Sequence, residues 1–228
     1  MYKVFIFLLF SVSLFSSQIK SLEKGYLVVA LKYDRNPMSF LSKSGQLKGI
    51  EVNLMDKISD ILNVRVKYIE LNENEAKNSL LNNKIDIIID SSIKSLNNDN
   101  NIVYSKSYFY DKQVLLISKN SKLDAKDEFK DINIGSLKNS IFLEDFLKIK
   151  PKSKLVLFSE LFQLKKALEY KNVEGILLDY ELANYLVKSS NNSFKILDIN
   201  LSNHPYKMAF NKDNFELKNR IDDILNRL

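Results

Sequence analysis

The feature that most constrains the fold is a regular alternation of short apolar runs with segments of helical periodicity. Residues 26–31 and 85–89 are almost continuously apolar, which favours buried strands, and residues 64–69 alternate apolar with polar side chains. Between these runs, apolar residues recur every three or four positions over 50–62 and 73–83, as they do on one face of a helix. Strand, helix, strand, helix, strand predicts a parallel sheet covered by helices.

The same alternation returns in the second half of the chain. The further strands expected are 113–118, 132–135, 154–158, 173–178, 194–197 and 206–210, and the further helices are 141–149, 160–170, 180–188 and 215–228. This pattern predicts two α/β lobes joined by extended segments near 111–118 and 203–210. Because ligands of open parallel sheets bind beyond the carboxyl ends of the strands, we expect a small-molecule site in the cleft between the lobes.

The first twenty residues differ in composition from the rest of the chain. Lys3 precedes the mostly apolar run 4–15, and the small polar residues Ser16 and Ser17 follow it. This is the layout of a secretory signal peptide, and the run is shorter than the roughly 20 apolar residues of a spanning helix. An N-terminal anchor or a buried strand is the alternative. We expect residues 1–20 to be cleaved and the mature protein to be periplasmic.

Composition excludes several classes of site. The 228 residues include no cysteine, which excludes a disulfide framework, a thiolate metal site and a lipid-modified N-terminal cysteine, so a lipoprotein is not expected. The single histidine, His204, argues against a Ser-His-Asp triad or a multi-histidine zinc site, whereas carboxylate or lysine chemistry stays open. The net charge is +6, but the lysines are scattered and there is no arginine cluster. We therefore expect no cofactor, no metal ion and no nucleic-acid partner.

Seven short segments follow one another in a distinctive order and spacing. They are 27–40, 45–54, 83–89, 104–109, 134–140, 173–179 and 206–212. Together, over about residues 25–225, they resemble the bacterial extracellular solute-binding proteins of family 3, the polar amino-acid binding components of ABC importers.

The resemblance implies a type II periplasmic binding protein fold. In this fold each of two lobes is a mostly parallel sheet flanked by helices, and two hinge segments join the lobes. The first lobe is expected over 21–111, with 207–228 returning to it, and the second over 112–206. An amino acid lies between the lobes with its carboxylate on an arginine and backbone amides, its ammonium on an aspartate and its side chain against aromatic residues. Such groups replace the hydration that a zwitterion loses when it leaves water.

The resemblance also nominates site residues. Asp179 falls on the ammonium-binding aspartate and Ser140 on a hydroxyl that receives the carboxylate, with helix N-capping as the alternative role of each. Where the family carries its carboxylate-binding arginine, this chain has Asn98, which leaves the ligand unidentified. The charge is expected from Arg35 or Lys94, unless these are ordinary loop and surface residues. The other ligand-binding residues expected are Tyr33, Asp90, Ser91, Ser92 and Lys138.

These observations predict a monomeric, non-enzymatic protein that captures a small polar solute, most simply an amino acid, for an inner-membrane ABC permease. If Asp34, Asp90 and Asp179 all face the cleft, they favour a cationic over an acidic ligand. Two alternatives stay open. One is a secreted dehydratase-like enzyme on the same fold, with Asp90 or Glu174 as acid or base. The other is an envelope sensor or partner-binding module that has lost the ligand site.

Overall fold

The computed structural model describes residues 19–89, 99–138, 140, 143–201 and 203–228. No helix within these ranges is long and apolar enough to span a bilayer. The predicted signal peptide lies almost wholly outside the described residues. The other predictions that fall outside them concern Asp90, Ser91, Ser92, Lys94 and Asn98.

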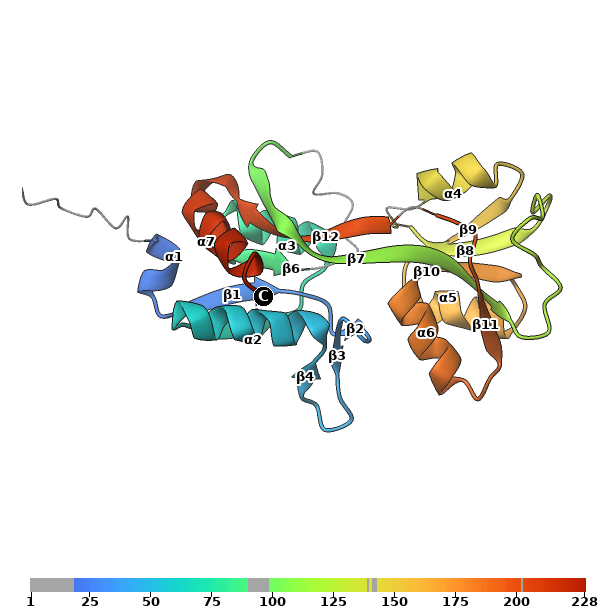
Figure 1. Ribbon diagram of the computed structural model, residues 1–228, viewed down its shortest axis with the longest axis horizontal. Coiled ribbons are helices and arrows are strands. Elements are labelled where there is room, and N and C mark those ends of the chain that lie inside the picture. Colours follow the sequence, from blue (N-terminus) through green and yellow to red (C-terminus); the bar gives the residue numbers. More distant parts are fainter. Residues whose placement is uncertain (1–18, 90–98, 139, 141–142, 202) are drawn as a thin grey trace, which may run out of the picture.

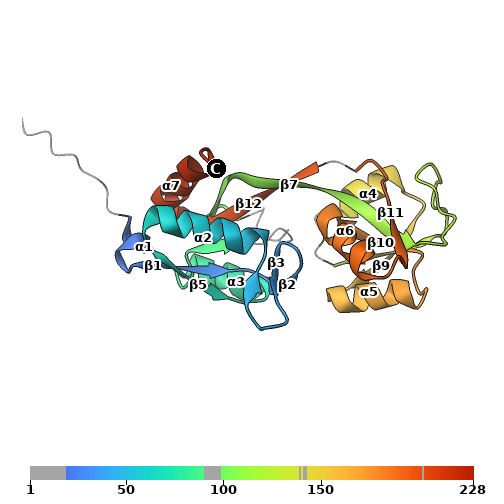
Figure 2. The same ribbon diagram turned by 60° about the horizontal axis from the view of Figure 1, so that its bottom comes forward.

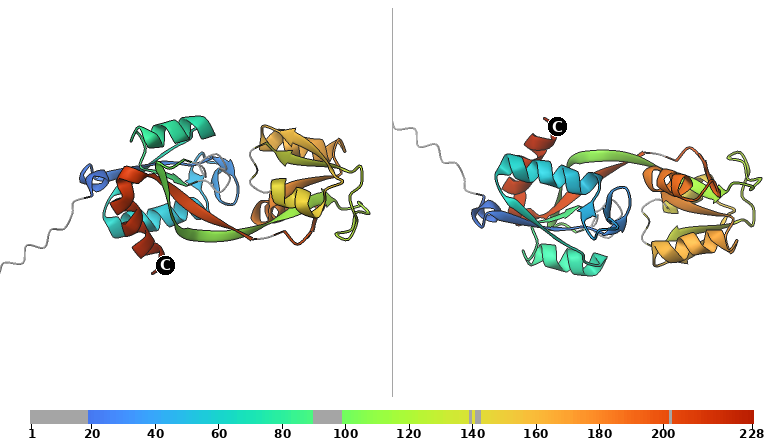
Figure 3. Two further views of the ribbon diagram at one scale, coloured as in Figure 1. Left: turned by 90° about the horizontal axis from the view of Figure 1, so that it is seen from above. Right: turned by 90° about the horizontal axis from the view of Figure 1, so that it is seen from below.

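The first lobe is built on a parallel sheet. Its elements are α1 (Lys20–Glu23), β1 (Tyr26–Ala30), α2 (Ile50–Leu62), β5 (Arg65–Ile69), α3 (Glu73–Leu81), β6 (Ile87–Ile89), the 3-10 turn η2 (Lys212–Asn214) and α7 (Phe215–Leu225). β1 lies between β5 and β6 and is parallel to both, as the strand and helix alternation predicts. Leu27 and Val29 pack with α2 and α7, whereas Ala30 packs with α3. These helices cover opposite faces of the sheet (Figure 3). Because both faces are covered, β1 and β6 are apolar almost throughout.

A second parallel sheet forms the other lobe. Its elements are β8 (Asn133–Leu137), α4 (Leu143–Ile149), β9 (Lys154–Phe158), α5 (Leu161–Glu169), β10 (Gly175–Asp179), α6 (Tyr180–Ser189) and β11 (Phe194–Leu197). β8 pairs in parallel with β9 and β10. Gly135 lets α5 approach the sheet closely, because a Cβ there would lie 2.7 Å from Leu164 Cδ1. The core of this lobe is separate from that of the first lobe.

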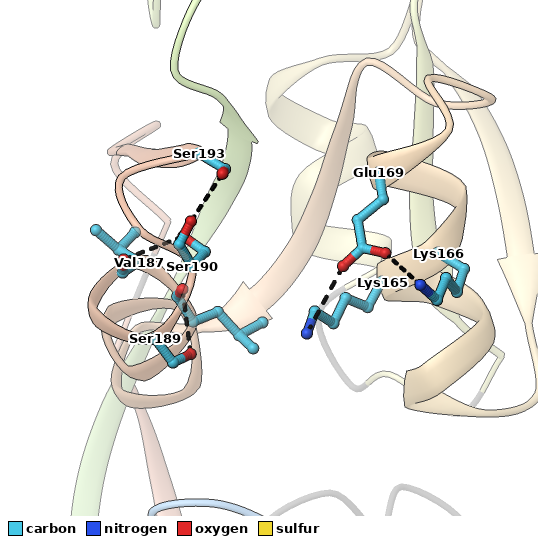
Figure 4. A network of polar contacts seen from close by, with 8 residues as sticks. Lys165, Lys166, Glu169, Val187, Ser189, Ser190 and Ser193 are labelled. Atoms are coloured by element: carbon cyan, nitrogen blue, oxygen red, sulfur yellow. Dashed lines mark hydrogen bonds and ion pairs between the residues drawn. The ribbon is translucent and has the colours of Figure 1, made fainter.

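Polar side chains finish the two longer helices of the second lobe (Figure 4). At the end of α6, Ser190 Oγ donates to the carbonyl of Val187 at 3.1 Å, and Ser193 Oγ donates to the carbonyl of Ser190 at 2.7 Å. On the last turn of α5, Glu169 pairs with Lys166 at 2.7 Å and with Lys165 at 3.7 Å. The serines satisfy carbonyl groups that a helix end leaves without intrahelical partners.

Two strands run from one lobe to the other (Figures 1 and 2). They are β7 (Ile102–Ser118) and β12 (Asn203–Asn211). β7 pairs with β12 over its first part and then with β10 and β11 in the second lobe, always antiparallel. Two lobes joined by two extended segments are therefore confirmed, whereas the lobe boundaries at residues 111 and 206 stay predictions. The strand predicted at 113–118 was too short, because the first half of β7 mixes polar and apolar side chains and lacks a clear period.

A small sheet that the sequence analysis missed projects from the first lobe. It consists of β2 (Asp34–Arg35), β3 (Ser39–Leu41) and β4 (Leu47–Lys48), paired antiparallel in that order. Strands of two or three residues are too short to give a periodic signal. This sheet matters for function because it carries Arg35.

Candidate functional site

A buried ion pair links the two lobes. Arg35 Nη2 of β2 donates to Asp179 Oδ2, at the end of β10, over 3.0 Å. Each side chain is only 11% exposed, although the residues are 144 positions apart in sequence. The two charges that the sequence analysis assigned to opposite ends of a ligand are thus brought together.

Asp179 occupies the N-cap position of α6 but does not act as a cap. Its backbone is extended, with φ −62° and ψ 142°, as N-cap residues usually are. Its side chain nevertheless makes no capping hydrogen bond with the helix. The carboxylate instead faces Arg35, so the N-cap role left open for Asp179 is not the one it plays.

Three further polar side chains surround this ion pair, and the sequence analysis identified none of them as site residues. Asp111 and Gln113 lie two positions apart on β7, on one face of the strand, and Gln113 is directly opposite Asp179 of β10. Tyr206 of β12 is the third. All three are at least 95% buried. Asp111 Oδ2 and Gln113 Oε1 have no hydrogen-bond partner within the described ranges, and the Tyr206 hydroxyl is directed at the Asp179 carboxylate.

Burial shapes the electrostatics of this cluster. Desolvation, and then the negative charge of Asp179, raise the pKa of Asp111 to about 6. The backbone N–H groups of Lys112, 2.7 Å from Asp111 Oδ1, and of Glu181 offset this pKa shift only in part. Burial also raises the pKa of Tyr206 above its usual range, and the charges of Asp179 and Asp111 raise it further. The cluster is therefore a buried region of negative potential.

Neighbouring basic side chains are directed elsewhere. Lys112 Nζ lies 2.6 Å from Asp198 Oδ2. His204, directly opposite Asp111 in the β7–β12 ladder, places Nε2 3.3 Å from Asp145 Oδ2 of α4. Within the described ranges, the cation that forms an ion pair inside the cluster is Arg35.

The other predicted site residues are more scattered. Tyr33 is half-buried, its ring packs against the core of the first lobe, and its backbone N–H donates to Glu70 Oε1 at 3.1 Å. Lys138 is exposed, and Ser140 is half-buried with its N–H donating to the carbonyl of Leu137 at 3.1 Å. Asp34 is exposed and precedes Arg35 on β2, so its side chain faces the other way. The arrangement in which Asp34 joins Asp179 at the site is not observed.

Sequence reasoning passed over Asp111 although one signal was present. Asp111 follows the aromatic run Tyr108, Phe109 and Tyr110 in a segment already assigned to a crossing between lobes. A charged residue in such a strand is unusual unless it has a partner or a function. No group of three or more His, Cys, Asp or Glu side chains in the described part of the chain is placed to hold a metal ion.

Comparison with known proteins gives one consistent result. Residues 27–228 match the family described as bacterial extracellular solute-binding proteins, family 3. The glutamine-binding protein of Geobacillus stearothermophilus is 26% identical over 196 residues, which cover 84% of this chain and 74% of that protein.

Solved structures confirm the predicted type II binding-protein fold. The arginine-bound form of truncated ArgBP from T. maritima is 24% identical with a TM-score of 0.78, and the match covers 91% of this chain and 98% of that one. A substrate-binding protein of an ABC uptake transporter from Streptococcus pneumoniae, with bound histidine, is 18% identical with a TM-score of 0.80, covering 92% of this chain and 89% of that one.

Proposed function

Because the chain belongs to the bacterial extracellular solute-binding proteins of family 3, we propose that it captures an amino acid between its two lobes and delivers it to an ABC permease. The glutamine-binding relative supports an amino acid as the cargo. The protein acts as a monomer in the periplasm after removal of residues 1–20.

The buried carboxylate of Asp179 is the observation that carries this proposal. A buried charge is stable only when another charge or several donors compensate it, and here the partner comes from the opposite lobe. A ligand ammonium replaces the Arg35 guanidinium on Asp179. Arg35 then binds the ligand carboxylate, for which its fork of N–H donors is suited. A zwitterion thus joins the two lobes in place of the direct ion pair.

Other residues complete the proposed site. Ser140 and Lys138 of the second lobe support the ligand carboxylate, and Tyr33 of the first lobe contacts the ligand side chain. The assignment of Asp90, Ser91 and Ser92 to the ligand rests on the sequence alone, because these residues lie outside the described ranges.

The dehydratase-like alternative loses one of its two acid or base candidates. Glu174 precedes β10 and therefore lies at the opposite end of this strand from Asp179. Its Oε2 accepts a hydrogen bond from the backbone N–H of Asn133 at 2.9 Å, and the residue is exposed. Such a carboxylate has neither the burial nor the position that acid–base catalysis beside Asp179 requires.

A thermal-shift screen of residues 21–228 tests the proposal. The panel contains the twenty amino acids, small peptides, polyamines and keto acids, and isothermal titration calorimetry follows every hit. A ligand of the folded state raises Tm with its concentration. We expect one class of amino acid to do so, and Asp179→Asn to weaken its binding by about 10- to 100-fold, because a charge-assisted hydrogen bond is lost.

Glu169→Gln is the matched control, since it removes an exposed carboxylate of the same lobe that is paired only on the surface of α5 (Figure 4). It should leave affinity unchanged. The proposal is wrong if no amino acid raises Tm, or if Asp179→Asn binds the hit as tightly as the unmodified protein does.

A further inference from the structure

The sheet where the lobes join presents more hydrogen-bond acceptors than donors. Asp111 and Gln113 share one face of β7, and Asp179 lies opposite Gln113 on β10, so the three side chains project from the same side of the sheet. The Tyr206 hydroxyl is close enough for the charges of Asp179 and Asp111 to act on it. Buried polar atoms in proteins are almost always paired. Here Asp111 Oδ2 and Gln113 Oε1 lack partners, and the Tyr206 oxygen can still accept while its hydroxyl is directed at Asp179. These three acceptors indicate a missing group that is rich in donors.

The charges of the cluster point to the same kind of group. Asp111 and Asp179 supply two buried carboxylates, and Arg35 supplies one cation. Lys112 and His204 are turned to Asp198 and Asp145. The described part of the cluster thus has one negative charge in excess. A neutral zwitterion leaves that excess in place, whereas a ligand with a net charge of +1 cancels it.

We propose that Asp111 is a second carboxylate of the ligand site and selects an amino acid that carries an additional amino or guanidinium group. This inference rests on the proposed function and names the substrate class within it. The α-ammonium binds Asp179, and the second cationic group binds Asp111 Oδ2, Gln113 Oε1 and the Tyr206 oxygen. An ammonium offers three N–H donors and a guanidinium five, which suits these three acceptors.

The fold compensates the buried Asp111 carboxylate only in part. Its hydrogen bonds come from the backbone N–H groups of Lys112 and of Glu181 at the start of α6, and burial without a paired cation is unfavourable for a carboxylate. A ligand cation at Asp111 Oδ2 reverses this, because an opposite charge favours the ionised form. Binding of such a ligand near pH 6 therefore releases a proton from Asp111.

The experiment compares arginine with citrulline, whose neutral ureido group has nearly the shape of a guanidinium. Calorimetry at pH 7.5 measures both affinities for residues 21–228, for Asp111→Asn and for the control Glu169→Gln, whose exposed carboxylate pairs with Lys166 on the surface of α5. We expect arginine to bind at least tenfold more tightly than citrulline. Asp111→Asn should reduce the ratio to about threefold or less, and Glu169→Gln should preserve it.

Lowering the pH gives the same test without a substitution. At pH 5 most of Asp111 is protonated, while both ligands keep their charges, so the arginine to citrulline ratio should fall about tenfold. Several charged or titratable groups surround Asp111. They are the adjacent Lys112 of β7, Arg35 of β2, Asp179 of β10, Tyr180 and Glu181 of α6, and His204 and Tyr206 of β12. A fall that disappears in Asp111→Asn belongs to Asp111, and one that persists there contradicts the inference.

The outcomes separate this inference from the proposed function. If neutral amino acids bind through Asp179 as tightly as basic ones, the function holds and the role of Asp111 is wrong. If no amino acid binds but putrescine binds and loses affinity in Asp111→Asn, the cation site holds and amino-acid capture is wrong. Absence of binding by putrescine and by every amino acid of the panel overturns both.

Discussion

The two halves of the interlobe ion pair are held in very different ways. Asp179 ends a strand whose five residues are all buried, between β7 on one side and β8 on the other. Arg35 belongs to a two-residue strand in a small sheet, and it has an exposed neighbour, Asp34. The acid is thus fixed by the core of the second lobe, whereas the base reaches it from a projecting hairpin.

The largest expected effect compares the support of Asp179 with that of Arg35, by changing one apolar residue of β10 and one of the small sheet. Ile176 of β10 is fully buried, and Ile176→Ala should lower the free energy of unfolding by about 2–5 kcal/mol, since it leaves a cavity behind Asp179. Leu41 of β3 is 49% exposed, so Leu41→Ala should cost less than about 1 kcal/mol. Urea denaturation measures both. Equal losses would show that the two supports are equally rigid.

Removing the charge of Asp111, which lies beside Asp179, should stabilise the protein in the absence of ligand. The folded pKa of Asp111 is about 6, above its ordinary 3.8, so folding disfavours the ionised form. The resulting loss of stability is absent below pH 4, grows as pH rises through 6 and is complete at neutral pH. Asp111→Asn should therefore raise the free energy of unfolding by up to about 3 kcal/mol at pH 7 and not at pH 4. A pH series of denaturation curves without ligand measures this difference, and a pH-independent effect would contradict the assigned pKa.

The ion pair itself should respond asymmetrically. Arg35→Gln leaves the carboxylate of Asp179 buried and unable to turn to water, and should cost about 1–3 kcal/mol. Asp179→Asn should cost less, because Arg35 can swing into solvent from its short strand. The double variant should recover part of the sum, which a double-mutant cycle of urea denaturation measures. If Asp179→Asn lowers the free energy of unfolding more than Arg35→Gln does, Arg35 is the fixed partner and Asp179 the adaptable one.

The smallest expected change in stability comes from Asn72, which caps its helix, whereas Asp179 occupies an N-cap position without capping. Asn72 precedes α3 and accepts from the Glu75 N–H at 3.0 Å, while Glu75 Oε2 accepts from the Asn72 N–H at 3.2 Å. Asn72→Ala should cost about 1 kcal/mol and speed hydrogen exchange in the first turn of α3. Asp179→Ala should leave exchange in the first turn of α6 unchanged. Faster exchange there would show that Asp179 caps its helix after all.

The sequence predicts elements whose signal is local. β1, β6 and β10 could be placed because both of their faces are buried and their side chains are apolar up to the end of each strand, and Asp179 stood out because it is the charged residue that ends β10. Arg35 was selected as a charge near the site. Its pairing with Asp179 could not be foreseen, because it depends on two lobes that meet 144 positions apart. Asp111 and Gln113 were missed for a similar reason. Their neighbours in the cluster lie on β10 and β12, which pair with β7 but come much later in the chain.

The place of β12 in the sheet also bears on how the chain acquires its structure. β12 (Asn203–Asn211) lies between β6 and β7, so a middle strand of the first lobe comes from a segment more than 100 residues after β6. Domains usually fold as units, N-terminal first, while the chain is synthesised. The first lobe cannot complete its sheet in this way, because the sheet stays divided until β12 is available to pair with both β6 and β7. Such distant pairing slows folding, since a long loop must close before the strands can pair.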